Sequence, residues 1–597
     1  MRLSCGLFST TLALLSVFFF SNPAIAAHGI SIDGNLKYPA DFKKFDYASE
    51  SAKKGGHLVL HGLGSFDKMN PFTVKGTEPD GINELVFETL AIPSLDEPFA
   101  EYGLVAKDIA VAEDKRSVTF TIDERARFSD GTPITPEDIK FSLETLKSDK
   151  ALPNYQLYFQ DITRAEIIKP DKITFYFSQK NRELHMIAAQ LPVLSKKFYT
   201  AHPFGAPSLI PPLASGPYIV SDFKPDKHIT YTRNENYWAK DHPVRKGIFN
   251  FDKITYKYFK DQLVSLEAFK AHEFDFMYIN IAKQWARDLD GEKYDKKILV
   301  KELLQHKNNQ GMQGFVFNTR KTIFTDRKVR NAIGLAFDFE WTNTSLFFDQ
   351  YTASNSYFSN SELAASGLPG KKELELLKPF KDKLPPEVFT TPLTPVSTAP
   401  PQSLRANLRE AKNLLALAGW TIQDGQLKNQ SGEPFQFEIL LYSPSFARVM
   451  EPFTNNLKKL GIDANYRQID IALYIQRMQK HDFDMMVYTY GQSQSPGNEQ
   501  RNFWHSVSLD MEGSLNLAGI NDPAIDYLVD KLIYAETREE LETACKGLDR
   551  LLWYGYYLVP NWYIANHRIT YRNIFNRPEQ LPLYYSPFQA LMTWWMK

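Results

Sequence analysis

Apolar and polar residues alternate along several short stretches in the first half of the chain. Such alternation is typical of β-strands with one buried face, because successive side chains of a strand point to opposite faces of the sheet. The pattern predicts strands over residues 118–122, 173–177 and 229–231. The apolar positions carry Val, Ile, Phe or Tyr, which are residues that favour strands.

Stretches with the helical spacing of apolar residues lie between these strands. The clearest predicted helix begins after Thr135, which is expected to cap it, with Pro136 and Asp138 in the first turn. Further helices are expected over residues 326–336, 403–418 and 446–460. Interleaved strands and helices without an internal repeat predict α/β or α+β layers.

A proline-rich stretch interrupts the helices of the second half. Six prolines, together with Thr and Ser, lie between residues 385 and 401. Proline fixes φ and cannot donate a main-chain hydrogen bond, so this composition predicts an extended surface excursion. We interpret it as an insertion loop without a function of its own.

The N-terminus has the three parts of a secretory signal peptide. Arg2 supplies a positive charge, residues 12–20 form an apolar run, and residues 24–26 form a small-x-small cleavage site. The apolar run is much shorter than the roughly 20 residues that a membrane-spanning helix needs. We therefore expect residues 1–26 to be removed during secretion, so that the mature chain begins near Ala27.

Composition and charge exclude several classes of protein. The 597 residues include 69 Lys and Arg against 70 Asp and Glu, so the basic excess of a nucleic-acid binder is missing. The 43 Phe, 30 Tyr and 9 Trp predict large buried or ligand-lining aromatic surfaces. Cys545 would remain alone in the mature chain, which excludes an internal disulfide.

Motifs of catalytic and cofactor sites are absent from the sequence. We find no HExxH, CxxC or GxSxG motif and no phosphate-binding loop ending in GK[ST]. His57 and His61 share one face of a predicted strand without further ligands close in sequence, so no metal site is expected. We expect neither a cofactor nor enzymatic activity. A hydrolase that uses Asp482 or Asp484 is the alternative, although a loop entering a strand gives the same two residues.

Several collinear motifs resemble the family 5 extracellular solute-binding proteins, which are the peptide, dipeptide and nickel receptors of ABC importers. They are FSDGTPITPEDIKFSL (128–143), ASGPYIVSDF (214–223), RNENYW (233–238), EAFKAHEFDF (267–276), FNTRKTIFTDRKVRNAIGLAFD (317–338), REAKNLLALAGW (409–420) and LKKLGID (457–463). Within the family, the chain most resembles the YejA-type oligopeptide binders. The motifs of that branch are FDYASESAKKGG (45–56), FDFEW (337–341), NSYFSNSE (355–362) and LDRLLWYGYYLVPNWY (548–563). All of these motifs also fit turns and helix ends, so we assign them to the fold rather than to ligand contact.

The resemblance implies an α/β fold of the periplasmic binding protein type II, a "flytrap" of two mixed α/β lobes with the three-domain cluster C architecture. Domain I would comprise residues 27–73, 216–307 and 518–597, domain II residues 74–215, and domain III residues 308–517 with the proline-rich excursion 385–401. Hinges would lie near residues 308–313 and 510–518.

The resemblance also implies where a ligand binds. Peptides of this family lie extended between domains I and III and pair with exposed strands, which here would be residues 66–72 and 488–494. The candidate ligand-binding residues are Phe66, Asp67, Asn70, Phe72, Tyr488, Tyr490, Gly491, Gln492 and Trp504. The aromatic members would equally fit core packing.

One departure from the family concerns the peptide's α-amino group. Many oligopeptide binders have an Asp soon after the second strand, whereas GQSQSPGNEQ (491–500) has none and offers Glu499 as the nearest carboxylate. The ligand would then be N-blocked or modified, or its charge partner would lie elsewhere, for instance at Asp67.

The expected protein is a non-enzymatic periplasmic receptor, most simply a monomer. It would close around a short peptide or a peptide-like antibiotic such as microcin C and deliver it to an inner-membrane ABC permease with its ATPase subunits. The rival ligands are haem, a nickel chelate or an oligosaccharide. A chaperone-like role is a further alternative.

Overall fold

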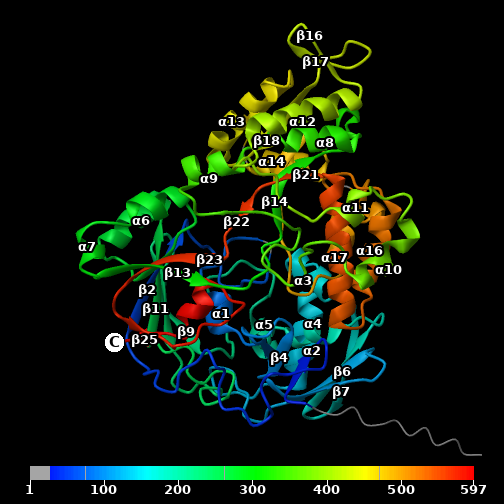
Figure 1. Cartoon of the computed structure of the whole chain (residues 1–597). Coiled ribbons are helices and arrows are strands. Elements are labelled where there is room, and N and C mark those ends of the chain that lie inside the picture. Colours follow the sequence, from blue (N-terminus) through cyan, green and yellow to red (C-terminus); the bar gives the residue numbers. More distant parts are fainter. Residues whose placement is uncertain (1–26, 74, 261, 470, 512) are drawn as a thin grey trace, which may run out of the picture.

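The computed structural model describes residues 27–73, 75–260, 262–469, 471–511 and 513–597 and consists of two lobes (Figure 1). The predicted signal peptide lies outside the described residues. Within the described ranges, none of the helices combines the length and apolarity that crossing a membrane requires.

The lower lobe contains the first half of the chain and its C-terminal end. Its strands are β1 (Gly29–Ser31), β2 (His57–Leu63), β3 (Ala91–Pro93), β4 (Ala100–Gly103), β5 (Ala106–Val111), β6 (Ser117–Ile122), β7 (Ile162–Lys169), β8 (Lys172–Phe177), β9 (Tyr218–Lys224), β10 (His228–Arg233), β11 (Lys253–Phe259), β12 (Phe276–Tyr278), β13 (Leu299–Gln305), β23 (Asn566–Arg572), β24 (Phe575–Asn576) and β25 (Trp595–Met596). Its helices are α1 (Ile82–Val86), α2 (Pro136–Leu146), α3 (Pro153–Tyr158), α4 (Leu184–Ala189), α5 (Lys196–Ala201), α6 (Gln262–Lys270), η1 (Gln284–Asp288), α7 (Glu292–Asp295) and α18 (Pro587–Leu591).

The sheets of this lobe have the orders β2-β11-β10-β9, β12-β23-β13, β1-β4-β3 and β5-β6-β8-β7. The three predicted strands are confirmed as β6, β8 and β10, and β6 pairs antiparallel with β8 so that Val118 lies opposite Phe175. One hydrophobic core runs through predicted domains I and II, which explains why they form a single lobe.

The upper lobe is built on the five-stranded sheet β19-β18-β20-β14-β21. Its strands are β14 (Met312–Phe317), β15 (Thr352–Ala353), β16 (Thr421–Gln423), β17 (Gln426–Lys428), β18 (Gln436–Leu441), β19 (Asp463–Gln468), β20 (Met485–Tyr490), β21 (Leu558–Pro560) and β22 (Trp562–Tyr563). Its helices are η2 (Thr322–Phe324), α8 (Arg327–Gly334), α9 (Phe339–Phe347), α10 (Lys371–Leu377), η3 (Lys378–Phe380), α11 (Glu387–Thr390), α12 (Leu404–Leu417), η4 (Pro444–Phe446), α13 (Ala447–Lys458), α14 (Ile471–Gln479), α15 (Glu499–Trp504), η5 (Ser506–Ser508), α16 (Pro523–Ile533) and α17 (Arg538–Gly555).

The predicted helices and caps agree with this structure. The Thr135 side chain accepts from the Asp138 N–H and forms a capping box at the start of α2. The other three predicted helices are α8, α12 and α13, and α8 is capped by Asp326, whose carboxylate accepts from Lys328 N at 2.8 Å.

The central strands of the upper sheet are apolar on both faces. In β14, Met312 and Val316 belong to the core on one face, whereas Phe315 and Phe317 belong to the core on the other. Both faces are therefore covered, one mainly by α16 and α17 and the other by α8, α12 and α13.

The predicted domain boundary at residue 518 is wrong. Helices α16 and α17 lie in the core of the upper lobe, with Leu528 and Leu548 buried there, and β21 pairs with β14. The apolar faces of these helices complete the core on one face of the upper sheet, so the chain returns to the lower lobe only after β22. The chain passes between the lobes at residues 306–311 and 564–565, and the hinge predicted at 510–518 is likewise wrong.

Candidate ligand-binding cleft

A cavity of about 500 Å³ lies where the two lobes meet. The lower lobe contributes residues around β4, the start and end of α4, and Tyr584, and the upper lobe contributes Ser493, Gln494, Ser495 and Glu499. Because its walls belong to different lobes, a ligand here contacts both of them and favours their closed arrangement.

Two further cavities, of about 450 and 590 Å³, lie in the lower lobe beside this one. Gln589 of helix α18 lines all three cavities, and Glu84 of α1 lines the two lower ones. The three cavities therefore adjoin one another around Gln589, which suits an elongated ligand.

The end of strand β20 leads directly into the interlobe cavity. Asn318 N donates to Asp484 O. By alternation along the strand, the main-chain N–H and C=O groups of residues 484, 486, 488 and 490 therefore point toward β14. The main-chain groups of Val487 and Thr489 point to the opposite side of β20, toward β18. The pairing of β18 with β20 ends at Met486. Thr489 and Gly491 are exposed, and a Cβ placed on Gly491 would meet nothing within 4 Å. Val487 O accepts from Tyr474 Oη, and Thr489 O accepts from Gly491 N at 3.1 Å. The open part of this edge is therefore the main-chain N–H of Thr489.

Strand β2 presents a second edge, on the lower lobe. It is the outermost strand of its sheet, with β11 on one side. On the other side Val59 N donates to Asp275 Oδ2 at 2.7 Å, and Asp275 N donates to Val59 O at 2.8 Å. By alternation, the main-chain groups of His61 and Leu63 face the same outer side, and the Leu63 side chain is 45 % exposed.

The first predicted ligand stretch, residues 66–72, is tied to the lower lobe. Phe66 and Phe72 are buried in its core. Asn70 Nδ2 donates to Phe204 O, and Asp67 Oδ1 accepts from Thr77 N at 2.6 Å. The main-chain N–H groups of residues 67, 68 and 69 donate to Thr77 O and Ser208 O. Contact of this stretch with a ligand would require these interactions to break, and it stays a prediction.

In the second predicted stretch, residues 488–494, some residues are buried in the core and others lie at the surface. Tyr490 and Trp504 are buried, with ring centroids 4.3 Å apart, and lie in the core beneath the cleft. Tyr488 is half-buried. Gln492 exchanges side-chain hydrogen bonds with Gln500, which also accepts from Trp504 Nε1 at 2.8 Å. Ligand contact by these residues also stays a prediction, and for Tyr490 and Trp504 it could only be indirect in this conformation.

The histidines and aspartates considered for chemistry are engaged in structural contacts. His57 Nε2 lies 2.8 Å from Thr255 Oγ1, and burial lowers the pKa of His61 to about 4. Asp482 forms an ion pair with Arg477 at 3.1 Å, and Asp484 forms one with Lys321 at 3.2 Å. Each aspartate therefore has an ion-pair partner of its own.

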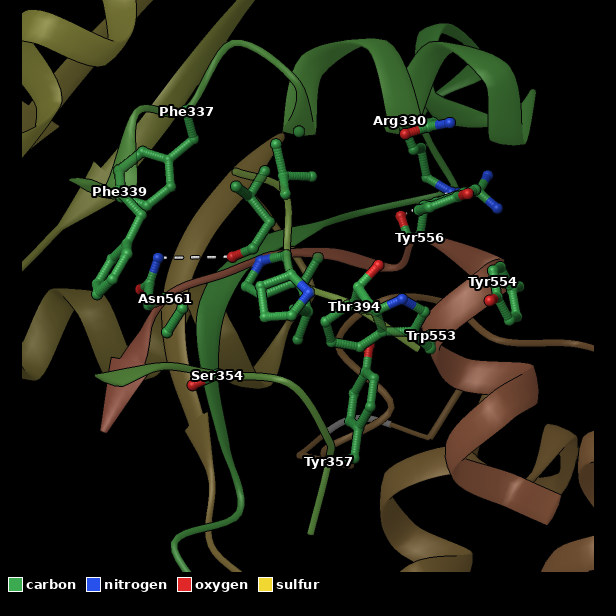
Figure 2. Close-up of a pocket in the computed structure, with 18 of the residues that line it drawn as sticks. Arg330, Phe337, Phe339, Ser354, Tyr357, Thr394, Trp553, Tyr554, Tyr556 and Asn561 are labelled. Carbon is green, nitrogen blue, oxygen red and sulfur yellow. Dashed lines mark hydrogen bonds between the residues drawn. The ribbon is translucent and has the colours of Figure 1, made fainter. Parts of the chain in front are cut away.

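A separate cavity of about 200 Å³ lies wholly inside the upper lobe (Figure 2). It is enclosed by α8, the end of α17 and residues 391–396 of the proline-rich stretch. Tyr554 Oη donates to Thr391 O at 2.7 Å, and Val388 and Leu393 are buried. These contacts anchor the proline-rich stretch on the lobe, while most of its residues are exposed or half-buried, as expected for a surface excursion. Closure of the lobes does not act on this cavity.

Buried polar contacts hold the two lobes together beside the interlobe cavity. Arg182 of the lower lobe donates to Pro496 O at 3.0 Å and to Ala535 O at 3.3 Å, both in the upper lobe. Ser495 Oγ donates to Glu183 Oε1 at 2.5 Å. Burial lowers the pKa of Arg182, which stays far above neutrality for a guanidinium, so these are charge-assisted hydrogen bonds.

Replacing Arg182 by methionine is expected to shift the protein toward an open arrangement by about tenfold, because two charge-assisted hydrogen bonds between the lobes are lost. Pulsed electron paramagnetic resonance between nitroxides on Asp114→Cys and Glu375→Cys, exposed positions on the two lobes, measures the populations. Cys545 is buried and does not take a label. Lys180→Met is the matched control, because Lys180 also bridges the lobes, to Glu536 at 2.8 Å, but both partners are exposed and contribute little. Equal shifts in the two variants would contradict this assignment.

Two α/β lobes joined by two crossings around a shared cavity define a two-lobed binding protein. Residues 101–508 match the bacterial extracellular solute-binding proteins, family 5. The chain is 38 % identical to the probable peptide-binding protein YejA of Agrobacterium fabrum, over 100 % of this chain and 98 % of that protein. This chain belongs to the family 5 extracellular solute-binding proteins, and the predicted resemblance to YejA-type proteins is confirmed. The family comprises receptors of ABC importers rather than enzymes.

Solved structures confirm the predicted flytrap fold. The oligopeptide-binding protein AppA of Bacillus subtilis, in complex with a nonapeptide, has a TM-score of 0.65 at 18 % identity and covers 92 % of this chain and 100 % of its own. NikA of Brucella suis, in complex with Fe(III)-EDTA, has a TM-score of 0.70 at 18 % identity and covers 91 % of this chain and 100 % of its own. At such identities these structures establish the fold alone.

Sequence reasoning missed the lower-lobe wall of the interlobe cavity. Glu101 in β4, together with Glu183 and Gln190 at the two ends of α4, lines it. The only signal in the sequence is a charged residue inside a strand, at Glu101. Charged residues within strands are too common for this signal to identify a binding site. Only the tertiary fold brings these residues opposite Gln494.

Proposed function

We propose that this protein is a periplasmic receptor that captures short peptides between its lobes and delivers them to an inner-membrane ABC permease. The observation that carries the proposal is the cavity formed by both lobes beside the end of β20, where the Thr489 N–H lies on an edge that β18 does not reach. An extended peptide can add to such an edge through its main chain, which gives affinity with little dependence on side-chain identity. The similarity to a probable peptide-binding protein supports this ligand class.

The receptor is secreted through the signal peptide of residues 1–26 and acts as a monomer. Closure around the peptide gives the permease a way to distinguish loaded from empty receptor, since only the loaded protein holds both lobes together. Peptide-like antibiotics such as microcin C would enter by the same route.

A metal chelate is the second candidate ligand, because NikA in complex with Fe(III)-EDTA shares the fold. The interlobe cavity of this chain argues against an anionic chelate, since four glutamates and no described Lys, Arg or His line it. Like charges in a partly enclosed site repel strongly.

The distance between nitroxides at Asp114→Cys and Glu375→Cys tests the proposed function. After removal of cargo, a mixture of tri- to hexapeptides is expected to shorten and narrow the distance distribution. A distribution that peptides leave unchanged, but that a metal chelate shortens, would reject the peptide assignment.

A further inference from the structure

The proline-rich stretch forms one wall of the cavity of about 200 Å³ inside the upper lobe (Figure 2). This wall is fixed at both ends. Tyr554 Oη donates to Thr391 O at 2.7 Å, and Thr398 N donates to Glu340 Oε2 at 3.0 Å. Between these two contacts, Thr394 lines the cavity and is also exposed to solvent. The cavity therefore lies directly beneath the surface of the lobe, away from the contact between the lobes.

The hydroxyl of Tyr357 borders this cavity without a hydrogen-bond partner. Tyr357 is 1 % exposed, and in Figure 2 its side chain points toward Trp553 and Thr394. Its main-chain N–H donates to Asp549 Oδ1 at 2.7 Å, whereas its Oη has no partner within the described part of the chain. Trp553 Nε1 likewise has none among the described residues. Buried donors are usually paired, so two unused donors in one cavity call for an acceptor.

Aromatic side chains form much of the remaining wall. They are Phe337, Phe339, Trp553, Tyr554 and Tyr556. Such rings pack favourably against a further ring, either stacked or edge to face. A cavity of roughly 150 Å³ between apolar side chains holds one benzene molecule. The larger volume here suits a single aromatic ring with a small substituent.

The charges around the cavity favour neither an anion nor a cation. None of the described lining residues is Asp, Glu, Lys or His. Arg330 lines the cavity, but its nitrogens donate to the main-chain oxygens of residues 324, 325, 555 and 556. Burial raises the pKa of Tyr357 well above its ordinary value, and of the nearby charges Asp549 raises it further whereas Arg330 lowers it. Because these opposite charges offset each other, burial of a charged ligand would not be compensated.

We propose that this cavity is a second ligand site, which binds a small neutral aromatic compound carrying a carbonyl group. A carbonyl oxygen has two lone pairs and can accept from both Tyr357 Oη and Trp553 Nε1. The ring packs against the aromatic walls. The proline-rich stretch, whose composition alone indicates an insertion loop without a function of its own, forms the outer wall of the site. This inference does not depend on peptide binding between the lobes.

Three fluorinated probes test the site on the full mature protein after removal of cargo. Fluorine NMR measures the dissociation constants of 4-fluoroacetophenone, fluorobenzene and 4-fluorobenzoate. Fluorobenzene lacks the acceptor, and 4-fluorobenzoate carries a charge. We expect 4-fluoroacetophenone to bind about tenfold more tightly than either of the others, because it alone is neutral and offers a carbonyl oxygen to the unused donors. An excess of pentapeptides should not displace it.

Two variants locate the probe in this cavity. Tyr357→Phe removes the unpaired hydroxyl but keeps the ring, so the fold should persist and the preference for 4-fluoroacetophenone over fluorobenzene should largely disappear. Gly334→Leu should block the cavity, since Gly334 lines it and a Cβ there would meet nothing within 4 Å. Tyr199→Phe is the matched control. It removes another buried hydroxyl without a described partner, in the lower lobe, and should leave binding unchanged.

Four results would overturn the proposal. The first is no binding of 4-fluoroacetophenone, and the second is affinity equal to that of fluorobenzene or 4-fluorobenzoate. The third is an undiminished preference in Tyr357→Phe, or undiminished binding in Gly334→Leu. The fourth is displacement by pentapeptides, which would place the probe between the lobes. Each of them leaves the proposed peptide-binding function intact, because that function uses a different cavity.

Discussion

Replacing Thr489 by proline is expected to lower the affinity for peptides by about a hundredfold or more. The main-chain N–H of Thr489 lies on the open edge of β20, and proline removes that donor and puts its ring in the path of a pairing strand. The fold should tolerate the change, because proline is compatible with a strand edge that pairs with no neighbour. Native mass spectrometry with a mixture of pentapeptides that have free N-termini measures the loss.

Thr489→Val is the matched control for this prediction. It changes the side chain but keeps the N–H, so main-chain pairing predicts an affinity close to that of the wild type. Thermal unfolding of both variants checks that the fold is intact. If the proline variant binds as the wild type does, peptides do not pair with this edge and the site must be placed elsewhere.

Replacing Arg550 by methionine is expected to destabilise the upper lobe by about 3–5 kcal/mol. Arg550 is fully buried on α17, and its Nε donates to Glu373 Oε2 at 2.6 Å. Its other nitrogens donate to Gly367 O and Ser366 O. Its loss would leave a buried carboxylate and two carbonyls without partners. Unfolding in urea, followed by near-UV circular dichroism, measures the change.

A second substitution separates the buried charge from the lost packing. Adding Glu373→Gln to Arg550→Met removes the unpaired carboxylate but keeps the amide oxygen that can accept from Gly370 N, as Glu373 Oε1 does at 3.0 Å. Part of the stability should return. Arg164→Met, which breaks the exposed ion pair with Glu166, should cost less than about 1 kcal/mol. If Arg550→Met costs no more than this surface change, the buried pair does not stabilise the lobe.

Local structure in this chain could be predicted where local interactions decide it. The alternation in β6, the capping box at Thr135 and the helical spacing of apolar residues in α12 act within a few residues, so the sequence alone identifies these elements. The family motifs supplied the two-lobed arrangement. They did not supply the boundary near residue 564, because α16 and α17 are amphipathic helices that could pack on either lobe, and only the completed core of the upper sheet decides between them.

The binding site was less predictable for the same physical reason. The resemblance pointed to the end of β20, and Gly491 does lie exposed beside the cleft. The lower-lobe wall depends on Glu101 and Glu183, which are far apart in sequence and meet Gln494 only through tertiary packing. The aromatic residues Phe66, Phe72, Tyr490 and Trp504 are suitable for a pocket by composition, but the structure uses them in its cores.

The central claim is that this receptor carries short peptides between its lobes. The most direct test is to purify the mature protein without added ligand, denature it and identify the released small molecules by mass spectrometry. The account predicts a mixture of short peptides that differ in sequence. Release of a single non-peptide compound, such as a metal chelate, haem or an oligosaccharide, would contradict it.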